Sequence, residues 1–361
     1  MDSASRRLTG HGSSKVSRQP TDTLGVTVRS IILCLLVLVA GVTGCETRAT
    51  SGQLSGEPGG ATDPPATATT MLASTELPLH RVGLRYIVTP YVERFEIERY
   101  FRPIATRLGA DLGVPVTIEV APTYGEQLER VATRAVELVT LSPLNYVIAR
   151  QRVPELVPVA SEIIAGSPTY SSFIVVRADD GAMRLADLRG RRVVFVDERS
   201  ASGFLFPYVS LLDAGIDPER DLGGVSFAGT HAAAAMDVLL GRADAAAVAS
   251  TLFVEEPNTS AGTALDVGAL RILYKSATLP LDVTCAVGLS ESAVAKVRTA
   301  FLRINTRTAA GRDVLGRGRR ITGFMAVDDR LYDDIRRALA RVSAHRARHG
   351  FQPTAVSLRS P

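Results

Sequence analysis

Two serines, Ser200 and Ser202, lie between an apolar run at 193–196 and a run of helical character at 204–214 that Gly215 closes. The first run is short and rich in β-branched residues, which predicts a buried strand. A strand followed by a small polar loop and a helix brings unpaired N–H groups and the positive end of the helix dipole to one point. The pattern predicts an anion-binding site, although an ordinary unit whose serine only caps the helix has the same pattern.

The composition indicates a folded protein rather than a nucleic-acid-binding one. Of 361 residues, 46% are hydrophobic and 22% are charged, which is enough apolar material for two lobes. The net charge of +4 comes from basic residues scattered among acidic ones without interleaved aromatic residues, which argues against nucleic-acid binding. The three cysteines, Cys34, Cys45 and Cys285, have no metal-binding or disulfide spacing. Because no nucleophile and base pair up, the sequence predicts no enzyme, no cofactor and no metal site.

An apolar run of 12 residues at 31–42 dominates the N-terminal region. It is too short for a membrane-spanning helix of about 20 residues but suits the hydrophobic region of a signal peptide; a plain membrane anchor is the alternative. The run ends in Val-Thr-Gly-Cys at 42–45, which resembles a bacterial lipobox. We therefore expect a signal peptide with a long N-terminal lead at 1–44, a lipidated Cys45, and a flexible tether rich in Ser, Thr, Gly and Pro at 45–78.

The rest of the chain alternates short apolar runs with segments of helical spacing. For example, a predicted helix at 124–135 lies between predicted strands at 116–120 and 136–141. Alternation of this kind predicts an α/β fold with mixed, mostly parallel sheets, and the number of elements fits two lobes better than one. The basic residues Arg317, Arg319 and Arg320 are interpreted as part of a solvated loop.

Four segments occur in the order seen in the phosphonate- and phosphite-binding components of ABC importers: 166–176 (GSPTYSSFIVV), 200–207 (SASGFLFP), 229–231 (GTH) and 279–282 (LPLD). The chain resembles this family over about 82–340. The resemblance implies a two-lobed fold of the periplasmic-binding-protein type II class, with the ligand in a cleft between the lobes. Lobe 1 would comprise 79–177 and 283–346, lobe 2 would comprise 178–282, and a basic tail would follow at 347–361.

The resemblance also implies a set of residues that share the ligand cleft. Hydroxyls, an imidazole and helix N-termini would donate hydrogen bonds to the oxygens of a phosphorus oxyanion. An aspartate would accept from a P–OH group and so reject ligands such as sulfate, which would leave the carboxylate without a donor. One hydroxyl is lost, because alanine stands where the commoner family pattern has threonine. The implied residues are Tyr124, Tyr170, Ser200, Ala201, Ser202, His231 and Asp282.

One departure from the family narrows the expected ligand. Members that bind aminoalkylphosphonates carry a carboxylate in the stretch that corresponds to 249–251, where this sequence has Ala-Ser-Thr. We therefore expect a small ligand without an amine: phosphite, methylphosphonate or phosphate. The resemblance implies a monomeric, lipid-anchored receptor outside the cytoplasm that delivers this ligand to a membrane permease. A ligand-sensing module of the same fold, coupled to a signalling partner, is the alternative.

Overall fold

The structure is a computed structural model that describes residues 83–91, 94–254, 265–316 and 320–350. The chain divides into two compact units, 1–70 and 71–361, and every described residue belongs to the second. The predicted signal peptide at 1–44, Cys45 and the tether at 45–78 lie outside the described residues, as does most of the predicted tail at 347–361. Each helix in the described part of the chain is too short or too polar to cross a bilayer.

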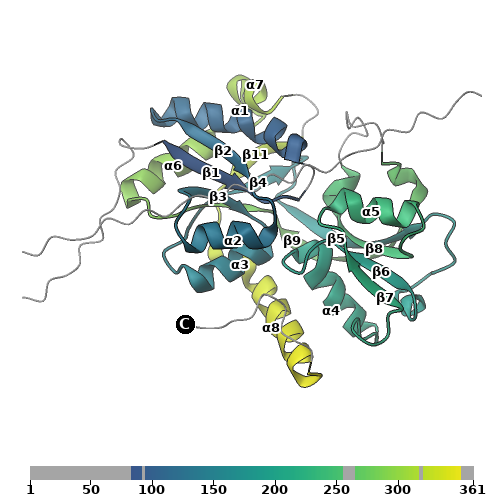
Figure 1. Cartoon of the computed structure of the whole chain (residues 1–361). Helices are drawn as coiled ribbons and strands as arrows, with labels where there is room; N and C mark the ends of the chain where they lie inside the picture. Colours follow the sequence, from purple (N-terminus) through teal and green to yellow (C-terminus); the bar gives the residue numbers. More distant parts are fainter. Residues whose placement is uncertain (1–82, 92–93, 255–264, 317–319, 351–361) are drawn as a thin grey trace, which may run out of the picture. The chain divides into compact units, whose positions relative to one another are not determined.

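The first sheet has six strands: β1 (Leu84–Val88), β2 (Val116–Val120), β3 (Leu138–Leu141), β4 (Val157–Ile164), β10 (Val283–Ala286) and β11 (Ile321–Met325). Their order is β11-β4-β10-β3-β1-β2 (Figure 1). The helices that accompany it are α1 (Arg94–Leu112), α2 (Tyr124–Ala132), α3 (Pro143–Arg152), α6 (Glu291–Arg303), α7 (Ala309–Leu315) and α8 (Asp333–Arg348). On β1, Tyr86 packs with α1 and α6, whereas Ile87 packs with α2 and α3 on the opposite face. Helices thus bury both faces of this sheet.

The second sheet has five strands: β5 (Thr169–Arg177), β6 (Arg192–Phe195), β7 (Gly224–Phe227), β8 (Ala245–Ala249) and β9 (Leu270–Pro280). Their order is β7-β6-β8-β5-β9. The buried side chains of α5 (His231–Leu239) pack with Val175 and Val248 on one face. Those of α4 (Phe206–Asp213) pack with Ile174 and Ala247 on the other face. Successive side chains along each strand point to opposite faces, so this sheet has a separate hydrophobic core on each face.

The strand pairing corrects two details of the predicted fold. The sheets are mixed, as predicted, but parallel pairs do not predominate, since five of the nine strand pairings among the described residues are antiparallel. Each antiparallel pair includes one of the strands that flank the two passages between the sheets, at 165–168 and 281–282. The predicted end of the first segment of lobe 1 at residue 177 is one strand too late, because β5 pairs with β8 and β9 of the second sheet.

The unit around Ser200 has the predicted order of strand, loop and helix, but its helical part begins earlier than predicted. The Ser200 hydroxyl accepts a hydrogen bond from the Gly203 N–H group at 3.0 Å and so caps the first turn. A π-helical turn at Ala201–Leu205 then leads into α4. This turn lies tightly against the chain that leaves β6, because a Cβ atom at Gly203 would lie only 2.5 Å from the Val196 side chain.

Replacing Gly203 by alanine is expected to lower the free energy of unfolding by about 1–3 kcal/mol, because an added methyl group in a closed contact forces the backbone to shift. Urea unfolding followed by circular dichroism measures this loss. Gly181→Ala is the matched control, since a Cβ atom there meets nothing within 4 Å. Equal stabilities of the two variants would contradict the expected contact.

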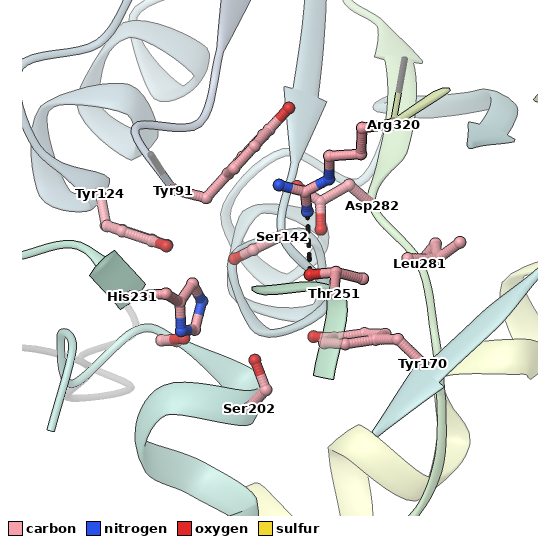
Figure 2. A pocket seen from close by; sticks show the side chains of 11 residues that line it. Tyr91, Tyr124, Ser142, Tyr170, Ser202, His231, Thr251, Leu281, Asp282 and Arg320 are labelled. Carbon is pink, nitrogen blue, oxygen red and sulfur yellow. Dashed lines mark hydrogen bonds between the residues drawn. The ribbon is translucent and has the colours of Figure 1, made fainter. Parts of the chain in front are cut away.

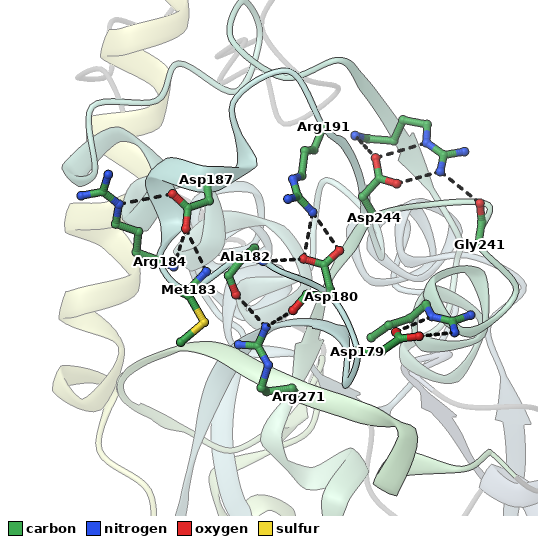
Figure 3. A network of polar contacts seen from close by, with 12 residues as sticks. Asp179, Asp180, Ala182, Met183, Arg184, Asp187, Arg191, Gly241, Asp244 and Arg271 are labelled. Atoms are coloured by element: carbon green, nitrogen blue, oxygen red, sulfur yellow. Dashed lines mark hydrogen bonds and ion pairs between the residues drawn. The ribbon is translucent and has the colours of Figure 1, made fainter.

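Ion pairs hold the opposite end of β6 in place (Figure 3). Arg191 donates to both carboxylate oxygens of Asp180, at 2.9 and 2.8 Å. Arg192 pairs with Asp244, the residue before β8, at 2.7 Å. Arg271 of β9 donates to the backbone carbonyl oxygen of Asp180 at 2.8 Å. These contacts join the segment after β5 to the start of β6 and to β9, and they join β6 to β8. They therefore fix the end of the second sheet that lies opposite the loop at Ser200.

Candidate ligand-binding site

A small cavity lies where residues from both sheets meet (Figure 2). Its volume is about 20 Å³, on a scale in which about 10–15 Å³ holds one water molecule. This volume is the space open to the centre of a water molecule, so the cavity itself extends further by the radius of water. Its radius is then about 3 Å, which is the size of a tetrahedral oxyanion. The lining residues are Tyr91, Tyr124, Ser142, Tyr170, Ser200, Ser202, His231, Thr251, Leu281, Asp282 and Arg320.

Six of the seven predicted site residues line this cavity: Tyr124, Tyr170, Ser200, Ser202, His231 and Asp282. Tyr124 and His231 are the first residues of helices α2 and α5, whereas Ser200 caps the helical turn that precedes α4 and Ser202 lies in it. Several helix N-termini therefore meet at one point, which concentrates N–H donors and positive dipole ends there. Ala201 is the exception, because its side chain packs in the hydrophobic core and does not line the cavity.

The imidazole of His231 is neutral and has a defined tautomer. Its Nδ1 atom accepts a hydrogen bond from the backbone N–H of Ala249 at 3.0 Å, so the ring proton sits on Nε2. Burial, and to a smaller extent the nearby charge of Arg320, lowers the pKa of His231 to about 3. His231 is therefore a hydrogen-bond donor at neutral pH without carrying a charge.

Asp282 belongs to a group of two carboxyls and one guanidinium, in which Glu162 is buried and Asp282 and Arg320 are half-buried. Burial raises the pKa of Asp282 to about 7, and Arg320 opposes this rise. Burial and the charge of Asp282 together raise the pKa of Glu162 to about 8, against the opposing effect of Arg320. Glu162 is 1% exposed and does not line the cavity. Near neutral pH at least one carboxyl holds its proton, so this group is not a net negative barrier to an anion.

The two tyrosines of the site are neutral hydroxyl donors. Burial raises the pKa of both Tyr124 and Tyr170 well above the usual value, while hydrogen bonds to Ser200 and Ser202, respectively, oppose the rise. Both serines are only 2% exposed. The cavity thus offers hydroxyls, one imidazole N–H and one guanidinium, a donor set suited to the oxygens of a small anion.

A comparison with known proteins now identifies the family. The family model described as "ABC transporter, phosphonate, periplasmic substrate-binding protein" matches residues 86–332, which is more than half of the chain. The chain belongs to this family. The phosphate-import protein PhnD of Mycolicibacterium smegmatis is 29% identical over 216 residues, which are 57% of this chain and 67% of that relative.

Two solved structures share the fold at 19% sequence identity. PhnD1 of Prochlorococcus marinus, in complex with methylphosphonate, has a TM-score of 0.62 and covers 72% of this chain and 97% of its own. A binding-protein component of a phosphonate ABC transporter from Pseudomonas aeruginosa has a TM-score of 0.64 and covers 74% of this chain and 88% of its own. They confirm the predicted two-lobed α/β class.

Family membership makes this chain a substrate-binding protein of a phosphonate ABC transporter, from a family of periplasmic proteins. Such a protein is a non-enzymatic transport component, so the prediction that the chain is not an enzyme is confirmed. The alternative of a ligand-sensing module with a signalling partner gains no support from these matches.

Five lining residues were not among the predicted ones: Tyr91, Ser142, Thr251, Leu281 and Arg320. Interpreting Arg320 as part of a solvated loop was wrong. Its guanidinium lies 4.4 Å from the centre of the Tyr91 ring and donates to the Thr251 hydroxyl at 3.1 Å (Figure 2). Ser142 could have been found, because it caps α3 directly after β3 and so repeats the pattern seen at Ser200. No local signal marks Arg320.

Proposed function

We propose that the chain is a lipid-anchored receptor that binds phosphite, methylphosphonate or phosphate and delivers it to an ABC permease. The observation that carries the ligand class is a cavity of about 20 Å³ with hydrogen-bond donors around one carboxyl. The relatives agree with this chemistry, since one is named for phosphate import and another holds methylphosphonate.

The size and lining of the cavity favour a small ligand without an amine. Thr251, in the stretch where aminoalkylphosphonate-binding members carry an acid, lines the cavity with a hydroxyl that accepts from Arg320. An ammonium group on the ligand would therefore meet a guanidinium rather than a carboxylate, which is repulsive. The volume leaves room for one tetrahedral group and no long substituent.

The donors and the carboxyl divide the recognition between them. Ser200, Ser202, His231 and Arg320 donate to ligand oxygens that carry no proton. Asp282 shares one proton with the remaining oxygen, either by accepting from P–OH or by donating from its own carboxyl group. Binding closes the lobes over the ligand, since the site combines residues from both sheets.

The anchoring and delivery steps rest on the sequence and on the family. The apolar run at 31–42 and the motif that ends in Cys45 support cleavage and lipidation at that residue. The lipid would hold the monomeric folded domain on the outer face of the membrane. There it would meet a permease in the same membrane, which is the partner that an ABC transporter provides.

Isothermal titration of the full-length protein in detergent, with phosphite, methylphosphonate, phosphate, 2-aminoethylphosphonate and sulfate at pH 8, tests this function. We expect micromolar or tighter binding of at least one of the first three and no binding of sulfate. His231→Asn should weaken that binding about tenfold or more, because it removes the Nε2–H donor to a charged ligand.

The asparagine variant is chosen because its side-chain oxygen can still accept from the Ala249 N–H group, which preserves the bond that holds His231. Its melting temperature should therefore stay close to that of the wild type. Tight binding of 2-aminoethylphosphonate would overturn the ligand class, and unchanged affinity in His231→Asn would remove His231 from the site.

A further inference from the structure

Three side chains that can bind a metal ion converge at the C-terminal end of α8, away from the ligand cavity. His345 lies in the last turn of α8, and His349 follows one helical turn later. Asp217 lies in the loop between α4 and β7. The three candidate ligand atoms, one from each residue, all lie within 4.8 Å of one another. None of these residues lines the ligand cavity.

The distance between two of these atoms matches tetrahedral coordination. The carboxylate oxygen of Asp217 lies 3.3 Å from Nε2 of His345. In a tetrahedral zinc site with bonds of about 2.0–2.1 Å, neighbouring ligand atoms are about 3.3–3.4 Å apart. The ring of His349 is already close, with its centre 4.6 Å from that of His345. A nitrogen of His349 lies within 4.8 Å of both of these atoms.

The buried ring nitrogen of His345 is the second observation that points to a ligand. His345 is 8% exposed, and its Nε2 atom has no hydrogen-bond partner among the described residues. A buried polar atom without a partner costs about 1–3 kcal/mol, so native structures seldom leave one without a role. A metal ion between Nε2 and Asp217 would satisfy it.

We propose that Asp217, His345 and His349 bind one divalent transition-metal ion of the zinc class. Two imidazoles and one carboxylate suit Zn²⁺ and its first-row neighbours, whereas Mg²⁺ and Ca²⁺ prefer sites made of oxygen ligands. Water occupies the fourth position, because His349 lies on the exposed side. Two imidazoles one helical turn apart are spaced to share one ion.

The surrounding charges allow a cation here. Arg346, which follows His345 on α8, pairs with Glu198 at 3.2 Å and with Glu219 at 2.5 Å, so its charge is compensated. Arg220 lies 3.9 Å from the other carboxylate oxygen of Asp217, and its side chain is 57% exposed and able to turn away. The oxygen that faces His345, Oδ1 of Asp217, accepts one hydrogen bond from the backbone N–H group of Glu219 at 3.0 Å, which orients the carboxylate and leaves a second lone pair for an ion.

The proposed ion joins a helix that comes after the first sheet to a loop of the second sheet. Helix α8 comes after β11 of the first sheet and packs against both α3 and α4 (Figure 1). Asp217 belongs to the loop that leads from α4 to β7 of the second sheet. Arg341 of α8 also pairs with Asp213 at the end of α4. A bound ion would therefore fasten the end of α8 to the second lobe and stabilise the folded chain.

Titration of the chelator-treated full-length protein with Zn²⁺, in a buffer without phosphate, tests the site. We expect one Zn²⁺ per chain, a higher melting temperature with Zn²⁺ and no saturable binding of Mg²⁺. Co²⁺ in place of Zn²⁺ should give the visible absorption of a tetrahedral site. His349→Ala and Asp217→Asn should each weaken Zn²⁺ binding at least tenfold.

Arg348→Ala is the matched control, because Arg348 is exposed and lies next to His349. It should bind Zn²⁺ like the wild type, as should His231→Asn, which changes the histidine of the ligand cavity. Since His349 is exposed, its loss leaves the fold intact and the result interpretable. The proposal is overturned if the wild type does not bind Zn²⁺ saturably, or if His349→Ala and Asp217→Asn bind it as tightly as the wild type.

Discussion

Replacing Arg320 by methionine is expected to weaken binding of the phosphorus oxyanion by about 10- to 150-fold. Arg320 is the only cationic side chain among the described residues that line the cavity. A hydrogen bond between charged groups contributes about 1.5–3 kcal/mol, which corresponds to that range of affinity. The methionine side chain keeps most of the apolar stem that lies over Tyr91 while it removes the charge.

The fold should tolerate this change better than the affinity does. Arg320 holds down the pKa of both carboxyls, Asp282 and Glu162. Without it their pKa values rise further, so both groups stay protonated near neutral pH instead of remaining as unpaired buried charges. The melting temperature is thus expected to change little at pH 6, whereas the affinity falls.

Titration of wild type, Arg320→Met, Arg320→Lys and Arg330→Met with the tightest ligand measures this effect. Arg320→Lys keeps the charge but lacks the planar guanidinium, so its affinity should lie between those of the wild type and Arg320→Met. Arg330 pairs with Asp328 on the surface with a side chain that is 84% exposed, and its loss should have no effect. An affinity of Arg320→Met within threefold of the wild type would show that the guanidinium does not contact the ligand.

The local sequence pattern was enough to predict the loop at Ser200, because this residue lies between a β-branched strand and a helix. His231, at the start of an alanine-rich helix, was implied only by the resemblance to the family. Asp282 was implied by the resemblance, through the Leu-Pro-Leu-Asp segment between β9 and β10. Six of the predicted residues line one cavity because helix starts from both sheets meet there with a passage that joins the sheets.

The residues that were missed depend on pairing between distant strands. The backbone carbonyl of Arg320 accepts from the N–H group of Ala165, and β11, which follows, pairs antiparallel with β4. This pairing brings Arg320 close to Asp282, although its neighbours in the sequence are basic and indicate a solvated loop. Glu162 lies within β4, where a single carboxylate in an apolar strand carries no signal of its partner.

The lobe boundary was missed for a related reason. Strand β5 is buried along almost its whole length, and an apolar run of this kind is the same whether it belongs to the first or the second sheet. Only its antiparallel pairing with β8 and β9 places it in the second sheet. The direction of the antiparallel strands could not be predicted for the same reason. The sequence alone does not show in which direction a strand runs when the chain returns from the other lobe.

Replacing Asp282 by asparagine is expected to weaken binding of the phosphorus oxyanion about tenfold and to remove the discrimination against sulfate. An ionised Asp282 accepts from P–OH but repels sulfate, which has no proton to donate at neutral pH. An asparagine amide donates an N–H group at every pH, so sulfate can be accommodated. The variant loses a charged acceptor, and this accounts for the weaker binding of the natural ligand.

The raised pKa of Asp282 makes the same discrimination depend on pH in the wild type. Burial raises this pKa to about 7, so the carboxyl is mostly ionised at pH 8 and mostly protonated at pH 6. A protonated carboxyl is a donor, and the wild type should therefore bind sulfate measurably at pH 6 and not at pH 8. Asp282→Asn should bind sulfate equally at both pH values.

Glu162→Gln is the control, because Glu162 does not line the cavity and its loss should leave sulfate excluded at pH 8. If sulfate binds neither protein at either pH, then Asp282 is not the group that reads the proton of the ligand.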